Sequence, residues 1–117
     1  MKVNYKELVK EEISEGIFRI WLIDERAGAS NFFMRLFEIL PGFGTKEDSH
    51  PYEHEIFTLE GKGSVKVGRR SEIIRKGDAL YIPQGEVHSI KNLGENILKF
   101  LCVVPYSYLK IKEEKNG

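Results

Sequence analysis

The hydrophobic positions of this chain occur in short runs and alternations that Gly, Pro and Asn interrupt. Apolar residues at every second position, bounded by turn residues, are typical of β-strands. No segment keeps a helical period long enough to predict a stable helix, although residues 6–13 could form a turn or two. The pattern predicts strands over residues 3–8, 16–23, 32–40, 54–60, 64–68, 72–75, 79–82, 87–92 and 97–104.

Turn residues separate these strands. Gly and Pro interrupt the chain at residues 41–44 and 61–63, and residues 68–71 and 92–96 are typical of hairpin connections. Residues 24–31 predict a loop. Pro83 and Pro105 end strands, because proline cannot donate to a ladder. Many short antiparallel strands without helices predict an all-β sandwich or small barrel, whose inner face collects alternate side chains.

Composition narrows the class of protein. A chain of 117 residues predicts a single domain, and 41% hydrophobic residues suffice for one core. Eighteen basic and eighteen acidic residues argue against electrostatic binding of nucleic acid. Cys102 is the only cysteine, which excludes an intrachain disulfide and fits a reducing cytoplasm. No apolar run is long enough to cross a bilayer. We therefore expect a cytoplasmic protein with no membrane partner.

All three histidines of the chain lie in two motifs. The first motif covers residues 42–61 and contains Asp48, His50 and His54. The second covers residues 77–92, and its spaced residues are Gly77, Pro83, Gly85, His88 and Asn92. Imidazole is the commonest metal ligand in proteins, so the leading interpretation is a single metal site. The alternative is that each histidine is an ordinary hydrogen-bonded polar residue and that no metal binds.

Side-chain parity supports one shared site. If residues 48–58 are extended, Asp48, His50 and His54 lie on one face, because alternate residues of a strand share a face. Tyr52 has the same parity, but Pro51 obscures its direction. His88 lies on a distant strand and could complete the site from across the interior. Asp48 is either a direct ligand or a residue that orients His50.

These motifs resemble those of the cupin superfamily. The residues that match the second cupin motif are Asp78, Pro83, Gly85, His88 and Asn92. The residues with the spacing of the first are Gly42, Asp48, His50, His54 and Gly61. The resemblance implies a small antiparallel β-barrel of the jelly-roll or double-stranded β-helix type. It implies one cupin domain over residues 1–117, with a core barrel at 32–105, an N-terminal strand region at 1–31 and a tail at 106–117.

Two positions depart from the usual first motif. His54 stands where the family has Glu, and this variant resembles small cupins that bind metal through four histidines. Asp48 stands where the family has its first His. The resemblance therefore implies Asp48, His50, His54 and His88 as ligands, three imidazoles and one carboxylate. Such a set suits one divalent transition metal, namely Mn, Fe, Co, Ni, Cu or Zn.

Further candidates for the cavity come from parity. Lys99 should face water, which turns Leu98, Phe100, Cys102 and Val104 inward. Phe100 and Cys102 could border a metal cavity or simply belong to the core. Arg35 interrupts an apolar run, and a guanidinium inside a barrel needs an anionic partner, either a Glu of the protein or a substrate carboxylate. Alternatively, Arg35 lies at a subunit edge.

The sequence leaves two classes of function open. Four protein ligands on a six-coordinate metal leave two open positions, which is typical of catalytic sites. The resemblance favours oxygenation of a small organic molecule, with isomerase and lyase chemistry as rivals. The other class is a non-catalytic module that binds a small ligand. Residues 32–40 and 97–104 are apolar on both parities, so we expect a second subunit to cover the outer face in a homodimer.

Overall fold

The computed structural model describes residues 1–106, which form antiparallel β-strands and two short 3-10 helices. The all-β prediction is confirmed. Beyond Tyr106, the tail predicted at 106–117 lies outside the described residues. No helix within residues 1–106 is long and apolar enough to span a membrane. The strands are β1 (Glu11–Ser14), β2 (Ile17–Ile23), β3 (Phe32–Ile39), β4 (His54–Glu60), β5 (Lys62–Val67), β6 (Arg70–Arg75), β7 (Ala79–Ile82), β8 (His88–Asn92) and β9 (Leu98–Pro105).

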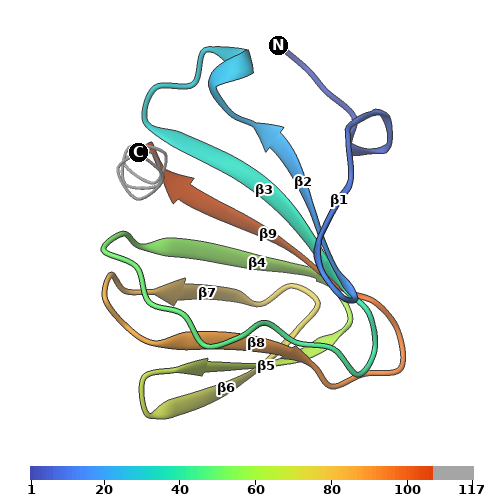
Figure 1. The fold of residues 1–117 in the computed structure, drawn as a ribbon, viewed down its shortest axis with the longest axis vertical. Helices are drawn as coiled ribbons and strands as arrows, with labels where there is room; N and C mark the ends of the chain where they lie inside the picture. Colours follow the sequence, from blue (N-terminus) through green and yellow to red (C-terminus); the bar gives the residue numbers. More distant parts are fainter. Residues whose placement is uncertain (107–117) are drawn as a thin grey trace.

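The strands form two sheets in a jelly-roll arrangement. The larger sheet has the order β1-β2-β3-β9-β4-β7, and the smaller has the order β6-β5-β8. Figure 1 shows the larger sheet in the upper part of the molecule and β8, β5 and β6 below it. Because β9 pairs with both β3 and β4, the last described strand lies in the middle of the larger sheet. The interior between the sheets is where alternate side chains converge.

Strand β9 shows this alternation most clearly. Its buried residues are Leu98, Phe100, Cys102 and Val104, and the residues between them are only partly buried. Lys99 points to the outer face, where its ammonium group lies 3.4 Å from the Glu38 carboxylate. The predicted inward set of β9 is therefore confirmed. Strand β9 thus presents a continuous row of apolar side chains to the interior.

The N-terminal segment differs from its prediction. Residues 3–8 are not a strand, because Tyr5–Glu7 form a 3-10 helix whose start is capped by the Asn4 side chain, an acceptor for Lys6 N. The strand in this region is β1, which the pattern did not predict. All four residues of β1 are exposed and only its partner β2 orders it, so no hydrophobic alternation marks it. A second 3-10 helix, Glu25–Ala27, lies within the predicted loop 24–31.

The N-terminal segment also covers part of the outer face of the larger sheet. Lys10 forms an ion pair with Glu38 of β3, and Lys99 lies 5.3 Å from the centroid of the Tyr5 ring. Leu36, on the same outer face, is only 2% exposed. At this end of β3 the chain therefore buries its own outer face, and a second subunit is not needed there.

One end of the interior is closed by a hydrogen-bonded turn. The buried Asn92 amide donates to the carbonyls of Ile39 (2.8 Å) and Asn96 (2.9 Å), and its oxygen accepts from Gly94 N at 2.8 Å. Gly61 joins β4 to β5 with φ +89°, and a Cβ there would lie 2.6 Å from the Ile97 carbonyl oxygen. Only glycine combines this conformation with such a close approach. The other end of the interior contains the first residues of β4 and β8.

Candidate metal centre

Backbone pairing brings the two histidine motifs together at the end of the interior away from Asn92. His54 begins β4 and His88 begins β8, while His50 lies in the irregular segment before β4. Asp48 forms an isolated bridge with His88, with N to O distances of 3.0 and 2.9 Å. Gly85 N donates to the His50 carbonyl at 2.6 Å. The expectation that residues 48–58 are extended throughout is wrong, since residues 49–53 are not in a strand.

The three imidazoles form one cluster. Each offers one nitrogen, and these atoms all lie within 4.8 Å of one another. Adjacent ligands of an ion with bonds of about 2.1 Å lie roughly 3 Å apart, and opposite ligands roughly 4.2 Å apart. Small rotations of the rings would therefore bring the three nitrogens onto one ion. His54 and His88 are 7% and 9% exposed, so the cluster faces the interior.

Contacts at the Nδ1 atoms of His88 and His54 favour the tautomer in which Nε2 is free to bind a metal. His88 Nδ1 lies 3.0 Å from the Glu86 carbonyl oxygen. Because a carbonyl only accepts, Nδ1 carries the proton in the neutral ring and Nε2 keeps its lone pair. His54 Nδ1 contacts Cys102 Sγ at 3.4 Å, and His54 Nε2 is buried without a hydrogen-bond partner among residues 1–106. Such outer contacts are typical of metal-ligating histidines.

The electrostatics of His54 agree with this role. The pKa of His54 is lowered to about 3, chiefly by burial and then by the charges of Arg35, His50 and His88. The ring is therefore neutral at physiological pH, which is the form that binds metal. A buried, neutral imidazole nitrogen without a partner fits a transition metal. The donor set of the cluster is compatible with the divalent ions named from the sequence.

Asp48 lies beside the cluster and outside the group of three imidazoles. Its Oδ2 is 3.3 Å from His50 Nε2, and its Oδ1 accepts from Ser49 N at 2.8 Å. The Asp48 side chain is 68% exposed. A separation of 3.3 Å suits a carboxylate that orients His50, and it also suits two adjacent ligands of one ion. Direct ligation by Asp48 thus stays a prediction.

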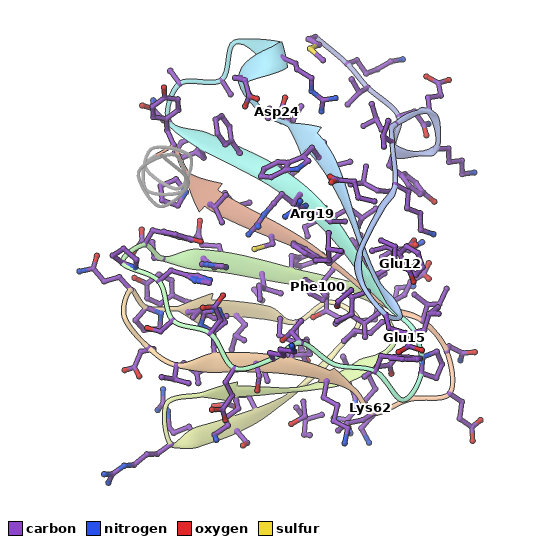
Figure 2. All side chains as sticks on the ribbon, in the orientation of Figure 1. Glu12, Glu15, Arg19, Asp24, Lys62 and Phe100 are labelled. Atoms are coloured by element: carbon purple, nitrogen blue, oxygen red, sulfur yellow. The ribbon has the colours of Figure 1, made fainter. Side chains whose placement is uncertain are left out.

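All seven residues that the sequence singles out line one cavity of about 770 Å³. They are Arg35, Asp48, His50, His54, His88, Phe100 and Cys102. The cavity also takes in residues 13–15, which belong to β1 and the turn that follows it, and residues 44–47. Figure 2 labels Glu15 at that turn and Phe100 on β9 inside the fold. The metal cluster therefore opens onto a space large enough for a small organic molecule.

Arg35 and Cys102 connect the cavity wall to the cluster. Arg35 is 5% exposed, and its Nη2 donates to Cys102 Sγ at 3.0 Å. The same sulfur contacts His54 Nδ1. Burial raises the pKa of the Cys102 thiol, and the charge of Arg35 lowers it in part. Arg35 therefore points into the interior, so the alternative that placed it at a subunit edge does not describe this chain.

Tyr52 is a residue of the site whose direction the sequence left open. Its ring stacks on His54, with centroids 5.2 Å apart and planes at 8°, and lies 4.7 Å from the His50 ring. The signal was its parity, shared with His50 and His54, which Pro51 obscured. The residues at the rim, 13–15 and 44–47, carried no signal, because they reach the cavity only through the folding of β1 and of the chain before His50.

Comparison with known sequences decides the family. The family described as Cupin domain matches residues 35–104. The chain belongs to the cupin family. The match contains both histidine motifs and strands β4 to β8, and it includes most of β3 and β9. The resemblance to cupins inferred from residue spacing is therefore confirmed, while the resemblance to cupins that bind metal through four histidines stays a prediction.

Three relatives illustrate what this cupin is similar to. The polyketide cyclase RemF from Streptomyces resistomycificus is 30% identical with a TM-score of 0.83, over 90% of this chain and 78% of that chain. An oxalate-binding protein of Thermotoga maritima is 33% identical over 64% of this chain and 62% of its own length. A 1-methylthio-D-xylulose 5-phosphate methylsulfurylase of Rhodospirillum rubrum is 31% identical over 61% of this chain and 46% of its own length. The matches cover 46–63% of the length of the curated relatives.

Proposed function

We propose that this cupin is a mononuclear metal enzyme that acts on a small organic molecule. His50, His54 and His88 would hold one divalent transition metal, with Asp48 as the fourth ligand. The observation that carries the proposal is the His54 Nε2 atom, which is buried at the cluster without a hydrogen-bond partner among residues 1–106. Leaving such an atom unsatisfied costs about 1–3 kcal/mol, and a bound metal would remove that cost.

The reaction that we favour is oxygenation with dioxygen. When bound, a redox-active metal with open positions would supply the activation of dioxygen and of a coordinated substrate oxygen. The protein would contribute a cavity of about 770 Å³, the neutral imidazole of His54 and the buried cation of Arg35. Metal-dependent isomerisation or lyase chemistry would use the same parts. These rivals gain support from relatives named as a cyclase and a methylsulfurylase.

A non-catalytic binding module is the second candidate. A relative from Thermotoga maritima that is named for binding oxalate supports it, whereas a similar solved structure from the same organism is titled a predicted oxalate decarboxylase and supports an enzyme. Of the serine and cysteine residues within 1–106 that line the cavity, Ser14 is exposed on β1 and Cys102 is buried against Arg35. Any turnover would therefore depend on the metal, so metal dependence separates the two candidates.

Metal analysis tests the site itself. Protein expressed without added metal, then purified without chelator, should contain about one transition metal per chain. The double variant His50→Ala/His88→Ala should contain almost none, because it removes two of the three clustered imidazoles. Retained metal in the double variant would show that the ion binds elsewhere. The variant Lys66→Gln, in an exposed ion pair with Glu47, is the matched control and should keep its metal.

Oxygen consumption tests the reaction. The protein, loaded in turn with Fe, Mn, Co, Ni, Cu and Zn, should consume dioxygen with one member of a panel of small phenols, keto acids and alkenes. Turnover should disappear in His54→Ala. Conversion of a substrate without oxygen uptake would favour an isomerase or lyase, and stoichiometric binding without conversion for every metal would favour the binding module.

We also propose that the protein is a cytoplasmic homodimer. Phe57 on β4 and Phe32 on β3 are 44% and 66% exposed, and Tyr81 on β7 is 53% exposed. Exposed apolar surface on a sheet favours burial against a partner. Light scattering at micromolar concentration should give twice the mass of the 13.5 kDa chain, and a monomer would contradict this proposal.

A further inference from the structure

The cavity wall beside the metal cluster contains a buried cation. Arg35 lies in β3 of the larger sheet, is 5% exposed and lines the same cavity as the three histidines. Its guanidinium lies 4.9 Å from the centroid of Phe37 and 5.6 Å from that of Trp21. The guanidinium is thus held between aromatic faces. A guanidinium fixed in this way presents a planar donor fork that matches a carboxylate.

The wall next to Arg35 is aromatic. The rings of Phe37 and Phe100 stack with centroids 5.4 Å apart and planes at 14°, and both residues line the cavity. Figure 2 shows Phe100 within the interior, below β9. Stacked, nearly parallel rings offer a flat apolar surface. A flat π system gains more from such a surface than a saturated body of the same size does.

The negative charges of the cavity lie at its rim, and a positive charge lies in its buried part. The three carboxylates that line it, Glu15, Glu47 and Asp48, belong to exposed residues at the rim. Glu47 is paired with Lys66 at 2.7 Å. Among residues 1–106, the buried charged side chain of the lining is Arg35. In a site shielded from water the attraction between a guanidinium and an anion is stronger than at a surface. The interior therefore favours a negatively charged ligand.

Arg35 is also close to the cluster. Cys102 Sγ contacts Arg35 Nη2 at 3.0 Å and His54 Nδ1 at 3.4 Å, so one sulfur atom separates the two groups. A molecule the size of a substituted benzene ring could therefore reach Arg35 with one group and the histidines with another.

We propose that the cavity binds a planar organic anion, a carboxylate or enolate conjugated to a flat π system. The anionic group pairs with Arg35, and the flat body lies against Phe37 and Phe100. A second donor atom of the ligand points to the histidine cluster. Only this contact rests on the proposed metal enzyme.

Binding of three probes to the full chain tests the class of ligand. Benzoate is a planar anion, benzamide is its neutral counterpart, and cyclohexanecarboxylate is an anion without a flat ring. The fluorescence of Trp21, the only tryptophan, reports binding because Trp21 lies against Arg35. We expect benzoate to bind at least tenfold more tightly than benzamide and several-fold more tightly than cyclohexanecarboxylate. Equal binding of benzoate and benzamide would overturn the proposal.

Variants locate the anion. Arg35→Gln should reduce the preference for benzoate over benzamide to about twofold or less, and Arg35→Lys should keep part of it. Lys46→Gln is the matched control, since it removes a positive charge from an exposed residue at the rim of the same cavity. It should change benzoate affinity less than twofold. An equal loss in Lys46→Gln and Arg35→Gln would mean that net charge, and not Arg35, attracts the anion.

Measurements with Zn-loaded and chelator-treated protein separate this proposal from the metal enzyme. If Arg35 binds the anion, the preference for benzoate persists without metal and is lost in Arg35→Gln in both forms. A preference that needs zinc and survives Arg35→Gln would show that the metal binds the carboxylate, and would overturn the role of Arg35. Absence of any metal binding would sink the proposed enzyme while the Arg35 result stands. Should Arg35→Gln not fold, Arg35→Met and the wild-type probe series decide the question.

Discussion

The two ends of the interior differ in whether their buried polar groups are hydrogen-bonded. At the closed end, the Asn92 side chain makes three hydrogen bonds, to Ile39 O, Asn96 O and Gly94 N. At the other end, His54 Nε2 is also buried but has no hydrogen-bond partner among residues 1–106. Asn92 and His88 lie four residues apart on β8, so a single short strand contributes to both ends.

This difference in hydrogen bonding distinguishes a polar residue that stabilises the fold from one whose free atom is suited to bind a ligand. Buried polar groups in folded proteins are almost always hydrogen-bonded, because an unsatisfied group costs free energy. Thr58 Oγ1 is also buried and has no hydrogen-bond partner within residues 1–106, but Thr58 is not among the residues that line the cavity. His54 Nε2 combines both properties, since it lacks a partner and faces the space where two other imidazoles converge. The four predictions below test this contrast.

The largest expected effect is on the pH dependence of stability. The folded pKa of His54 is about 3, below its ordinary value of 6.5, so the unfolded chain binds this proton more readily. The contribution of His54 to stability is therefore present above pH 6.5 and is lost as the pH falls toward 3. The loss amounts to about 1.4 kcal/mol per pH unit within that window.

Urea unfolding of metal-free protein between pH 7.5 and pH 4 measures this loss. The variant His54→Leu should lose less stability over the same range, because it lacks the buried ring. Parallel pH profiles of the wild type and His54→Leu would show that His54 does not cause the acid sensitivity.

At the closed end, Asn92→Ala should destabilise the protein by about 3 kcal/mol, because the backbone groups that Asn92 satisfies would lose their partners in a buried site. The free energy of unfolding from urea titration is the measurement. Metal content per folded chain should stay unchanged, since Asn92 is not in the imidazole cluster. A folded variant that loses its metal would show that the two ends are coupled and that the role of Asn92 is not confined to the stability of the fold.

Asp48→Asn should weaken metal binding about tenfold, or about 1.4 kcal/mol, if the carboxylate only orients His50. Isothermal titration with zinc measures the dissociation constant. Asp48 lies 3.3 Å from His50 Nε2, which fits both roles. A loss comparable to that of His50→Ala would identify Asp48 as a direct ligand and bring the count of ligands to four.

The smallest effect should be that of His54→Leu on the stability of the metal-free protein at pH 7.5. Replacing a buried nitrogen that has no hydrogen-bond partner with an apolar group should leave the free energy of unfolding unchanged, or raise it by up to about 1 kcal/mol. The same variant should bind no more than a small fraction of the wild-type metal. Destabilisation by 2 kcal/mol or more would show that His54 has a structural role similar to that of Asn92.

The strands of the core could be predicted from the sequence because their alternation reflects burial. β9 is the clearest example, since Leu98, Phe100, Cys102 and Val104 all face the interior as their parity requires. β1 could not be predicted in this way. Its residues are all exposed and are held only by pairing with β2, which leaves no hydrophobic pattern along the chain.

The histidine cluster could also be predicted, but its geometry could not. Motif spacing indicated that His50, His54 and His88 would meet, and their nitrogens do lie within 4.8 Å of one another. The position of Asp48 depends on its backbone bridge to His88, and that of Tyr52 on the irregular residues 49–53. Both are tertiary features, because residues far apart in the chain determine the local conformation.

The separation of His54 and His88 between the two sheets has a mechanical consequence. His54 begins β4 of the larger sheet, and His88 begins β8 of the smaller one. An ion bound by both imidazoles would link the two sheets at the end where residues 83–87 join β7 to β8. Metal scarcity would then loosen this end of the molecule first, and the lifetime of the folded chain would depend on the metal supply.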